Sequence, residues 1–136
     1  MSAKIAIENP PALGKPVGAY SHIARVKAGE FVFIAGQVAT DAAGAIVGGG
    51  DFEAQCGQAF ANIGAALAAV GAGFPDIVQF TTYLVHSQDI AKFAAFRARE
   101  FPRLFAKGAY PPNTLLIVDR LVNEAFLIEI QAVAAL

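Results

Sequence analysis

The sequence has a single cysteine, and only 15% of its 136 residues are charged. Cys56 alone excludes an intramolecular disulfide and any metal site built from several cysteines. The first eight residues lack the long apolar core of a secretory signal, so we expect a reducing, cytoplasmic setting. The chain also lacks an excess of charge of one sign, since 10 Lys and Arg stand against 11 Asp and Glu. We therefore expect no strong attraction to nucleic acid or to an anionic membrane.

What the sequence does have is apolar side chains, which make up 56% of it, against about 45–50% in a typical domain. A chain of this length suffices for one domain, residues 1–136, with a substantial core. Such a small domain has much surface to cover. The apolar excess therefore predicts that part of the surface is buried against other copies of the same chain.

Residues 54–75 carry no charge, and about 20 apolar residues can cross a bilayer. Three amide side chains, Gln55, Gln58 and Asn62, interrupt this stretch on one side of a helical projection. Cys56 lies on the opposite, apolar stripe. We therefore expect a core-facing amphipathic helix, capped by Asp51 and ending near Gly71 or Gly73, with no membrane partner. Cys56 is expected to be a small buried hydrophobe rather than a nucleophile.

The remaining patterns predict an α+β domain with the element order ββαβαββ. Residues 1–18 form a turn-rich lead-in, and residues 20–38 form two strands that meet in a hairpin turn at Ala28-Gly29-Glu30. A strand over 76–86 precedes a second helix, capped by Ser87 or Asp89 and running to about residue 105. The last two strands cover residues 114–118 and 126–133.

Glu129 is the first candidate for chemistry, because it lies inside an apolar strand. Strand alternation places it on one face with Leu127, Gln131 and Val133. If that face is covered, the carboxylate needs a partner, and such carboxylates concentrate at functional sites. The alternative is an edge position that water solvates.

Arg97 is the second candidate, because it points into the apolar face of the second predicted helix. An inward guanidinium must meet an anion from the protein or from a ligand. The alternatives are that Arg97 extends along the helix edge, or that a kink at Pro102 makes the projection misleading. The other cations of this helix are interpreted as a solvated face rather than an RNA-binding stripe. His22 and His86 lack the spacing of metal ligands, so no metal is expected.

Several stretches along nearly the whole chain resemble the RidA/YjgF family of reactive-intermediate deaminases. They are Gly18-Ala19-Tyr20-Ser21, residues 31–37 ending in Gly36-Gln37, the amides of the first helix, Thr81-Thr82-Tyr83-Leu84, and residues 127–134 around Ile128-Glu129-Ile130. The resemblance implies a chorismate-mutase-like fold and a homotrimer with a central β-barrel, helices outside and clefts between subunits. It also implies hydrolysis of small enamines and imines, such as 2-aminoacrylate, to the 2-keto acid and ammonia, without cofactor or metal.

The resemblance also implies site residues. Tyr20 matches the cleft tyrosine, and Glu129 matches the glutamate that aids the attacking water. Ala35 and Gly36 match a Ser-Gly pair, so position 35 has lost a hydroxyl. Asn113 stands where archetypal members have the arginine that binds the substrate carboxylate. Thr114 and Leu115 follow it in the same substrate-binding segment.

Because Asn cannot form a bidentate ion pair, the sequence looks like a divergent subgroup. Our hypothesis is that Arg97 supplies the missing cation to a ligand carboxylate, or pairs with Glu129 when the cleft is empty. Arg97→Ala is then expected to abolish binding of small carboxylates. Hydrolytic deamination is the leading prediction. The alternatives are a non-catalytic trimer that binds small metabolites and, less favoured, a ribonuclease or translation inhibitor.

Overall fold

The computed structural model describes residues 3–136, without the side chain of Lys107. Its main elements are β1 (Lys4–Glu8), β2 (Ile23–Lys27), β3 (Phe31–Gln37), α1 (Phe52–Ala69), β4 (Ile77–Leu84), α2 (Asp89–Leu104), β5 (Asn113–Ile117) and β6 (Ile128–Ala135). Short 3-10 helices cover Pro11–Leu13, Phe74–Asp76 and Ala106–Gly108.

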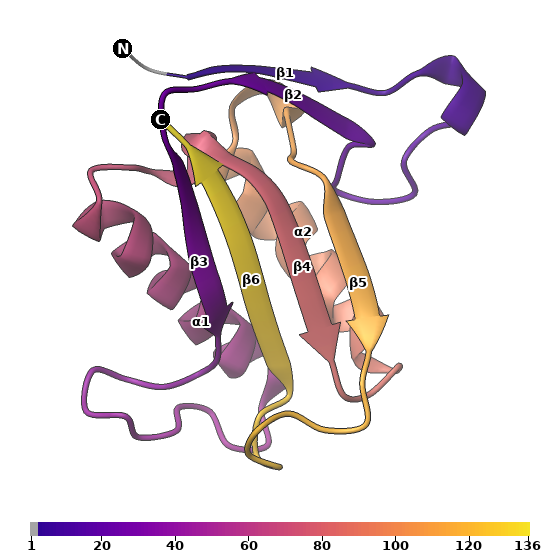
Figure 1. The fold of residues 1–136 in the computed structure, drawn as a ribbon. Helices are drawn as coiled ribbons and strands as arrows, with labels where there is room; N and C mark the ends of the chain where they lie inside the picture. The colour runs from indigo at the N-terminus through magenta and orange to yellow at the C-terminus, as the bar shows by residue number, and fades with distance from the viewer. Residues whose placement is uncertain (1–2) are drawn as a thin grey trace.

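The larger sheet has the strand order β3-β6-β4-β5. Strand β6 is antiparallel to both of its neighbours, whereas β4 and β5 are parallel and are connected through α2. A parallel pair needs such a crossover, and right-handed crossovers bring successive helices to the same side. Both helices accordingly lie behind the sheet in Figure 1, and its other face is left free of helices.

Strand β1 lies in the segment predicted to be a turn-rich lead-in, so the observed order begins with one strand more than expected. It pairs with β2 in a separate two-stranded antiparallel sheet, from Lys4 opposite Lys27 to Glu8 opposite Ile23. This small sheet lies across the top of the larger one in Figure 1. The α+β architecture itself is confirmed.

The predicted hairpin at residues 28–30 is wrong. Strands β2 and β3 belong to different sheets, and the chain turns a corner between them. The backbone N–H groups of Gly29 and Glu30 both donate to the carbonyl oxygen of Leu136, at 2.9 and 3.0 Å. The apolar β3 therefore finds its partner in β6, near the other end of the chain, rather than in the preceding strand.

The predicted start and end of α1 are confirmed. Asp51 accepts a hydrogen bond from the Ala54 N–H at 3.1 Å, and the helix stops before Gly71, whose φ is +73°. The predicted N-cap of α2, Ser87 or Asp89, is wrong. Gln88 is the N-cap residue, and its side chain makes no capping hydrogen bond. In the described chain no helix is both long enough and apolar enough to cross a membrane.

Phenylalanine side chains dominate the core between the helices and the sheet. The Phe60 ring lies in the middle of this cluster, stacked on Phe96 and edge-on to Phe80 and Phe101. Cys56 is fully buried beside this core, as predicted. Burial raises the pKa of its thiol, so Cys56 is uncharged at neutral pH.

The three amides of α1 do not form a solvated face. Gln55 is completely buried, where its Nε2 donates to the carbonyls of Gly48 and Ala125 and its Oε1 accepts from the Leu127 N–H. Asn62 donates to the Val38 and Thr40 carbonyls. These bonds fix the loop that follows β3 and the segment that leads into β6.

Candidate functional site

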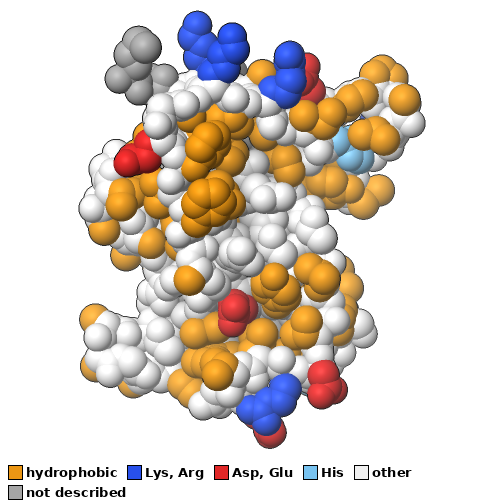
Figure 2. Space-filling model, viewed as in Figure 1, with side chains coloured by type: hydrophobic (Ala, Val, Ile, Leu, Met, Phe, Trp, Pro, Cys, Tyr) orange, Lys and Arg blue, Asp and Glu red, His pale blue; other side chains and the backbone are white. Residues whose placement is uncertain are grey.

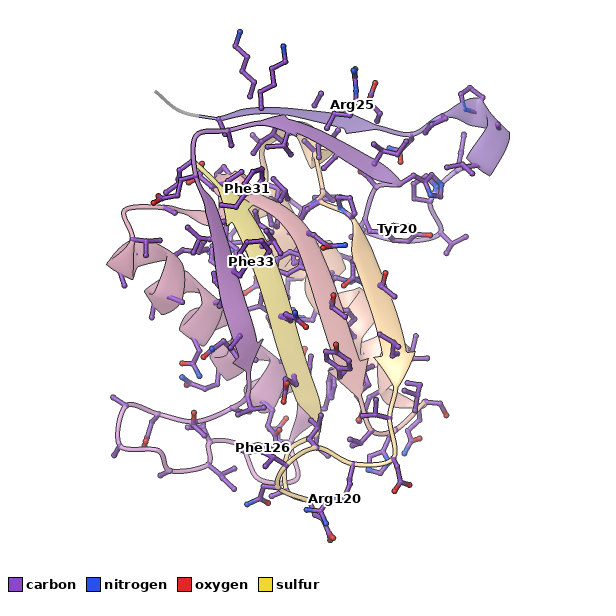
Figure 3. The ribbon with its side chains drawn as sticks, in the orientation of Figure 1. Tyr20, Arg25, Phe31, Phe33, Arg120 and Phe126 are labelled. Atoms are coloured by element: carbon purple, nitrogen blue, oxygen red, sulfur yellow. The ribbon has the colours of Figure 1, made fainter. Side chains whose placement is uncertain are left out.

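The face of the large sheet that the helices leave free carries apolar side chains along β3 and more polar ones along β4 and β6. Phe31 and Phe33 project from β3, and the Phe33 side chain is 79% exposed (Figure 3). In Figure 2 hydrophobic side chains gather in the upper and lower parts of this face. Exposed phenylalanines of this kind are typical of interaction surfaces.

Glu129 lies on this free face, half-buried, at the start of β6. It stands opposite Tyr83 of β4, and on its other side the register of β3 shifts between Ile34 and Gln37. Gly36 lies in that irregularity, where an added Cβ would collide with the Glu129 carboxylate. Glycine at position 36 is therefore what allows the carboxylate to lie against β3.

Tyr83 is a neighbour of Glu129 that the sequence analysis did not select. Its hydroxyl donates to Gln131 Oε1 at 3.3 Å, across β4 and β6 on the free face. Strand alternation within residues 77–84 places Tyr83 on the exposed side of β4, so the signal was available. The register between β4 and β6, which places Tyr83 beside Glu129, could not be inferred from the sequence.

Tyr20 lies in the loop before β2, next to the β5 edge of the sheet in Figure 3. Its ring meets the ring of His22 edge-on, with 6.0 Å between the centroids. Its hydroxyl accepts a hydrogen bond from the Val17 N–H at 3.5 Å. A hollow of about 360 Å³ opens beside His22, lined also by Gln79 and Pro112.

Arg97 is only 7% exposed, which confirms that it points inward from α2. Its guanidinium carbon lies 4.4 Å from the centroid of the Phe93 ring, and its Nη1 donates to the Ala19 carbonyl at 3.4 Å. Burial lowers the pKa of Arg97, although a guanidinium still keeps its charge at neutral pH. Within the described chain Arg97 forms no ion pair with Glu129, so a pairing of the two across subunits stays a prediction.

The three candidates of β5 do not share one face. Asn113 stands opposite Phe80 and Leu115 opposite Thr82, so both point to the helix-covered side. The Thr82 hydroxyl donates to Asn113 Oδ1 at 2.8 Å. Thr114 lies between them and points to the free face.

The structure therefore separates the predicted site residues into two groups. Ala35, Gly36 and Glu129 lie at the lower end of β3 and β6, on the free face. Tyr20, Arg97, Asn113 and Leu115 lie toward the β5 edge and the helix side, and Thr114 lies on the same strand, β5, but faces the free side. A single chain does not bring the two groups into one pocket. Among the described residues no cluster of three His, Cys, Asp or Glu residues suits a metal ion.

The chain is similar to known proteins over its whole length. A family model described as Endoribonuclease L-PSP matches residues 10–136. A RutC family protein from Pyrococcus horikoshii is 37% identical over 134 residues, which cover 98% of each chain.

Solved structures agree with this similarity. The structure of the Rid family protein YyfB from Yersinia pestis has a TM-score of 0.85 and 37% identity, with 100% of both chains covered. RidA from an Antarctic Psychrobacter has a TM-score of 0.68 and 29% identity, with 90% of this chain and 92% of that chain covered. On its sequence, its strand order and these similarities, the chain belongs to the RidA/YjgF family.

Proposed function

We propose that the protein hydrolyses small reactive enamines and imines, in clefts formed between the subunits of a homotrimer. Membership of the RidA/YjgF family supports a role in deaminating or binding small metabolites in general. One observation carries the more specific proposal. The carboxylate of Glu129 is half-buried on the sheet face that the helices leave free, and the missing side chain of Gly36 leaves room for it.

Hydrolysis of an imine requires few catalytic groups from the protein. An enamine that is protonated on carbon becomes an iminium ion, whose carbon is electrophilic. Glu129 accepts a proton from water as the water oxygen bonds to that carbon. Proton transfer to nitrogen and collapse of the resulting carbinolamine then break the C–N bond, giving a carbonyl compound and ammonia. The reaction as written consumes only the imine and water.

A trimer explains why the two groups of site residues lie apart in one chain. Packing the free faces of three copies around a common axis buries Phe31 and Phe33. It also brings the β5 edge of one protomer, with Tyr20, toward the Glu129 end of its neighbour. Each of the resulting clefts then draws its carboxylate and its tyrosine from different chains.

The solution mass tests this assembly. Three copies of a 14.1 kDa chain weigh about 42 kDa. Phe33→Asp is expected to leave monomers, because three carboxylates would be buried without partners in the trimer. Multi-angle light scattering distinguishes the two masses. A monomeric wild-type protein would contradict both the trimer and the shared cleft.

Gly36→Ala tests the close approach of Glu129 to β3. The new methyl group displaces the carboxylate, so we expect hydrolysis to slow by about 10- to 100-fold while the trimer persists. Gly49→Ala is the matched control, because a Cβ at Gly49 meets no atom within 4 Å. Equal rates for the two variants would argue against the role of Gly36.

The activity itself is tested with 2-aminoacrylate and longer enamines generated in situ. Keto-acid and ammonia release are followed with and without the protein. Acceleration over buffer supports the proposal. Binding of the keto-acid products without any acceleration would instead indicate the non-catalytic metabolite-binding trimer.

The description of the matched family model suggests ribonuclease activity as another candidate. The charged side chains of α2 give little support to a ribonuclease activity. Arg99 pairs with Glu53 at 3.0 Å, Arg103 pairs with Glu100 at 2.9 Å, and Arg97 is buried. RNA cleavage that weakens steeply with added salt would favour the ribonuclease over the deaminase.

A further inference from the structure

The Glu129 carboxylate is half-buried, yet no bond within the described part of the chain fixes its position. Among residues 3–136 no hydrogen bond and no ion pair joins it to another group. Its oxygens therefore keep their lone pairs for water, as a general base requires. A flexible side chain without such bonds must be held in place by the atoms that pack around it.

The backbone of β3 limits the carboxylate on one side. The carboxylate lies so close to Gly36 that an added Cβ there would collide with it. The neighbours of Gly36, Ala35 and Gln37, carry no charge, and the Gln37 amide donates to the Ala35 carbonyl at 3.0 Å. Strand β3 therefore contributes a wall, without a charge or a hydrogen bond to Glu129.

Tyr83 of β4 limits the carboxylate on the other side. It stands directly opposite Glu129 in the antiparallel register, and both side chains are half-buried on the free face. The Cβ atoms of such cross-strand pairs are about 4.5–5.5 Å apart, so the two side chains are neighbours. The ring of Tyr83 is rigid and broad, and it restricts the rotamers that would carry the carboxylate from β3 toward β4.

The hydroxyl of Tyr83 is directed away from Glu129. It donates to Oε1 of Gln131, the diagonal neighbour in β6, at 3.3 Å. This direction matters, because a donor bonded to a carboxylate favours the charged form and makes it a weaker base. The bond is long for a hydroxyl donor, so the phenol is free to change partner if the acceptor is removed.

We propose that Tyr83 is a positioning residue for the hydrolysis. Its ring holds the Glu129 carboxylate against Gly36, and Gln131 keeps its hydroxyl off that carboxylate. This inference rests on the proposed deaminase function. Tyr83 transfers no proton itself, and its effect on the reaction passes through the place and the basicity of Glu129.

Two substitutions separate the ring from the hydroxyl. Tyr83→Ala removes the ring, so the carboxylate gains rotamers, and we expect kcat to fall by about tenfold or more while KM stays within about twofold. Tyr83→Phe keeps the ring and is expected to retain kcat within about twofold. The trimer mass is recorded for both variants. A loss in Tyr83→Phe as large as in Tyr83→Ala, or no loss in either, would overturn the inference.

Gln131→Leu tests the direction of the hydroxyl. Without its acceptor the phenol is expected to donate to Glu129, which lowers the pKa of that carboxyl and slows hydrolysis by about three- to tenfold. Adding Tyr83→Phe removes the donor, so the double variant is expected to recover the wild-type pKa and rate. Gln88→Leu, the same change at an exposed amide of α2, is the matched control.

The pKa of Glu129 is measured by following its carboxyl carbon by NMR as the pH is varied. Tyr83 is the titratable side chain that faces Glu129 from β4, and the facing residues of β3 are uncharged. Any group that a neighbouring protomer contributes is the same in all the variants. A pKa that is equal in Gln131→Leu and in the double variant would contradict the role of Gln131.

The outcome separates this inference from the proposed function, because the NMR titration needs no turnover. Hydrolysis that depends on Glu129 but is insensitive to Tyr83 and Gln131 would overturn the inference and leave the deaminase. The expected order of pKa values, without hydrolysis of any enamine, would overturn the deaminase and support the placement of the carboxylate by Tyr83.

Discussion

Glu129→Gln is expected to lower the rate of enamine hydrolysis by about 100- to 10,000-fold, the range that a positioned general base contributes. The amide has nearly the same size and fits the same space beside Gly36, but it cannot take a proton from the attacking water. Initial rates of keto-acid release measure the effect, with the trimer mass recorded for the same samples. Because Glu129 lies on the free face and outside the core, we expect no loss of folding.

Glu124→Gln makes the same chemical change at a surface carboxylate, which pairs only with Arg120 among the described side chains. It is expected to hydrolyse enamines at the wild-type rate. If Glu129→Gln matched that rate, Glu129 would not be the base.

Mixing Glu129→Gln with a second variant tests whether two different chains contribute to each cleft. Tyr20→Ala removes the group on the β5 side, and Glu129→Gln removes the group on the β6 side. If the two groups come from different chains, unfolding and reassembling an equal mixture of the variants leaves about one quarter of the clefts intact. Activity near that fraction is expected. A mixture no more active than its components would place both groups in one chain.

Gln55→Leu is expected to lower the free energy of unfolding by about 3–6 kcal/mol, because three backbone groups lose their partner inside the protein. They are the carbonyls of Gly48 and Ala125 and the N–H of Leu127. The leucine recovers some apolar burial but satisfies none of the three groups. The loss is therefore larger than that of an ordinary surface substitution.

Urea unfolding at one fixed protein concentration measures this change, since assembly adds to the apparent stability. Gln88→Leu is the control, because Gln88 is exposed and its side chain makes no capping bond. We expect it to stay within about 0.5 kcal/mol of the wild type. A similarly small change in Gln55→Leu would mean that water replaces the lost bonds.

Features that depend on neighbouring residues were predictable from the sequence. The Asp51 cap, the end of α1 before Gly71 and the inward direction of Arg97 all follow from helical geometry over a few residues. The exposed or half-buried face that carries Glu129 follows from strand alternation in the same way. The matched stretches of sequence also identified the family, because they lie in these same local elements.

Features that depend on distant pairing were not predictable in this way. The corner at Gly29 and Glu30 forms because Leu136 is there to accept their N–H groups, and β1 exists as a strand because β2 lies beside it. Gln55 was assigned to a polar helix face because its partners Ala125 and Leu127 lie some seventy residues away in the chain.

The sequence by itself determined which side chains are chemically unusual, namely a carboxylate in an apolar strand and a guanidinium on the apolar side of a helix, and its resemblance to the family drew attention to the amide of Asn113. Only the tertiary structure decided that Glu129 lies across the sheet from Arg97 and Asn113, and that the buried Arg97 guanidinium pairs with no carboxylate among residues 3–136. The physical reason is that period and alternation set the direction of a side chain locally. What the side chain meets depends on the order of strands in the sheet and on the side on which the helices pack.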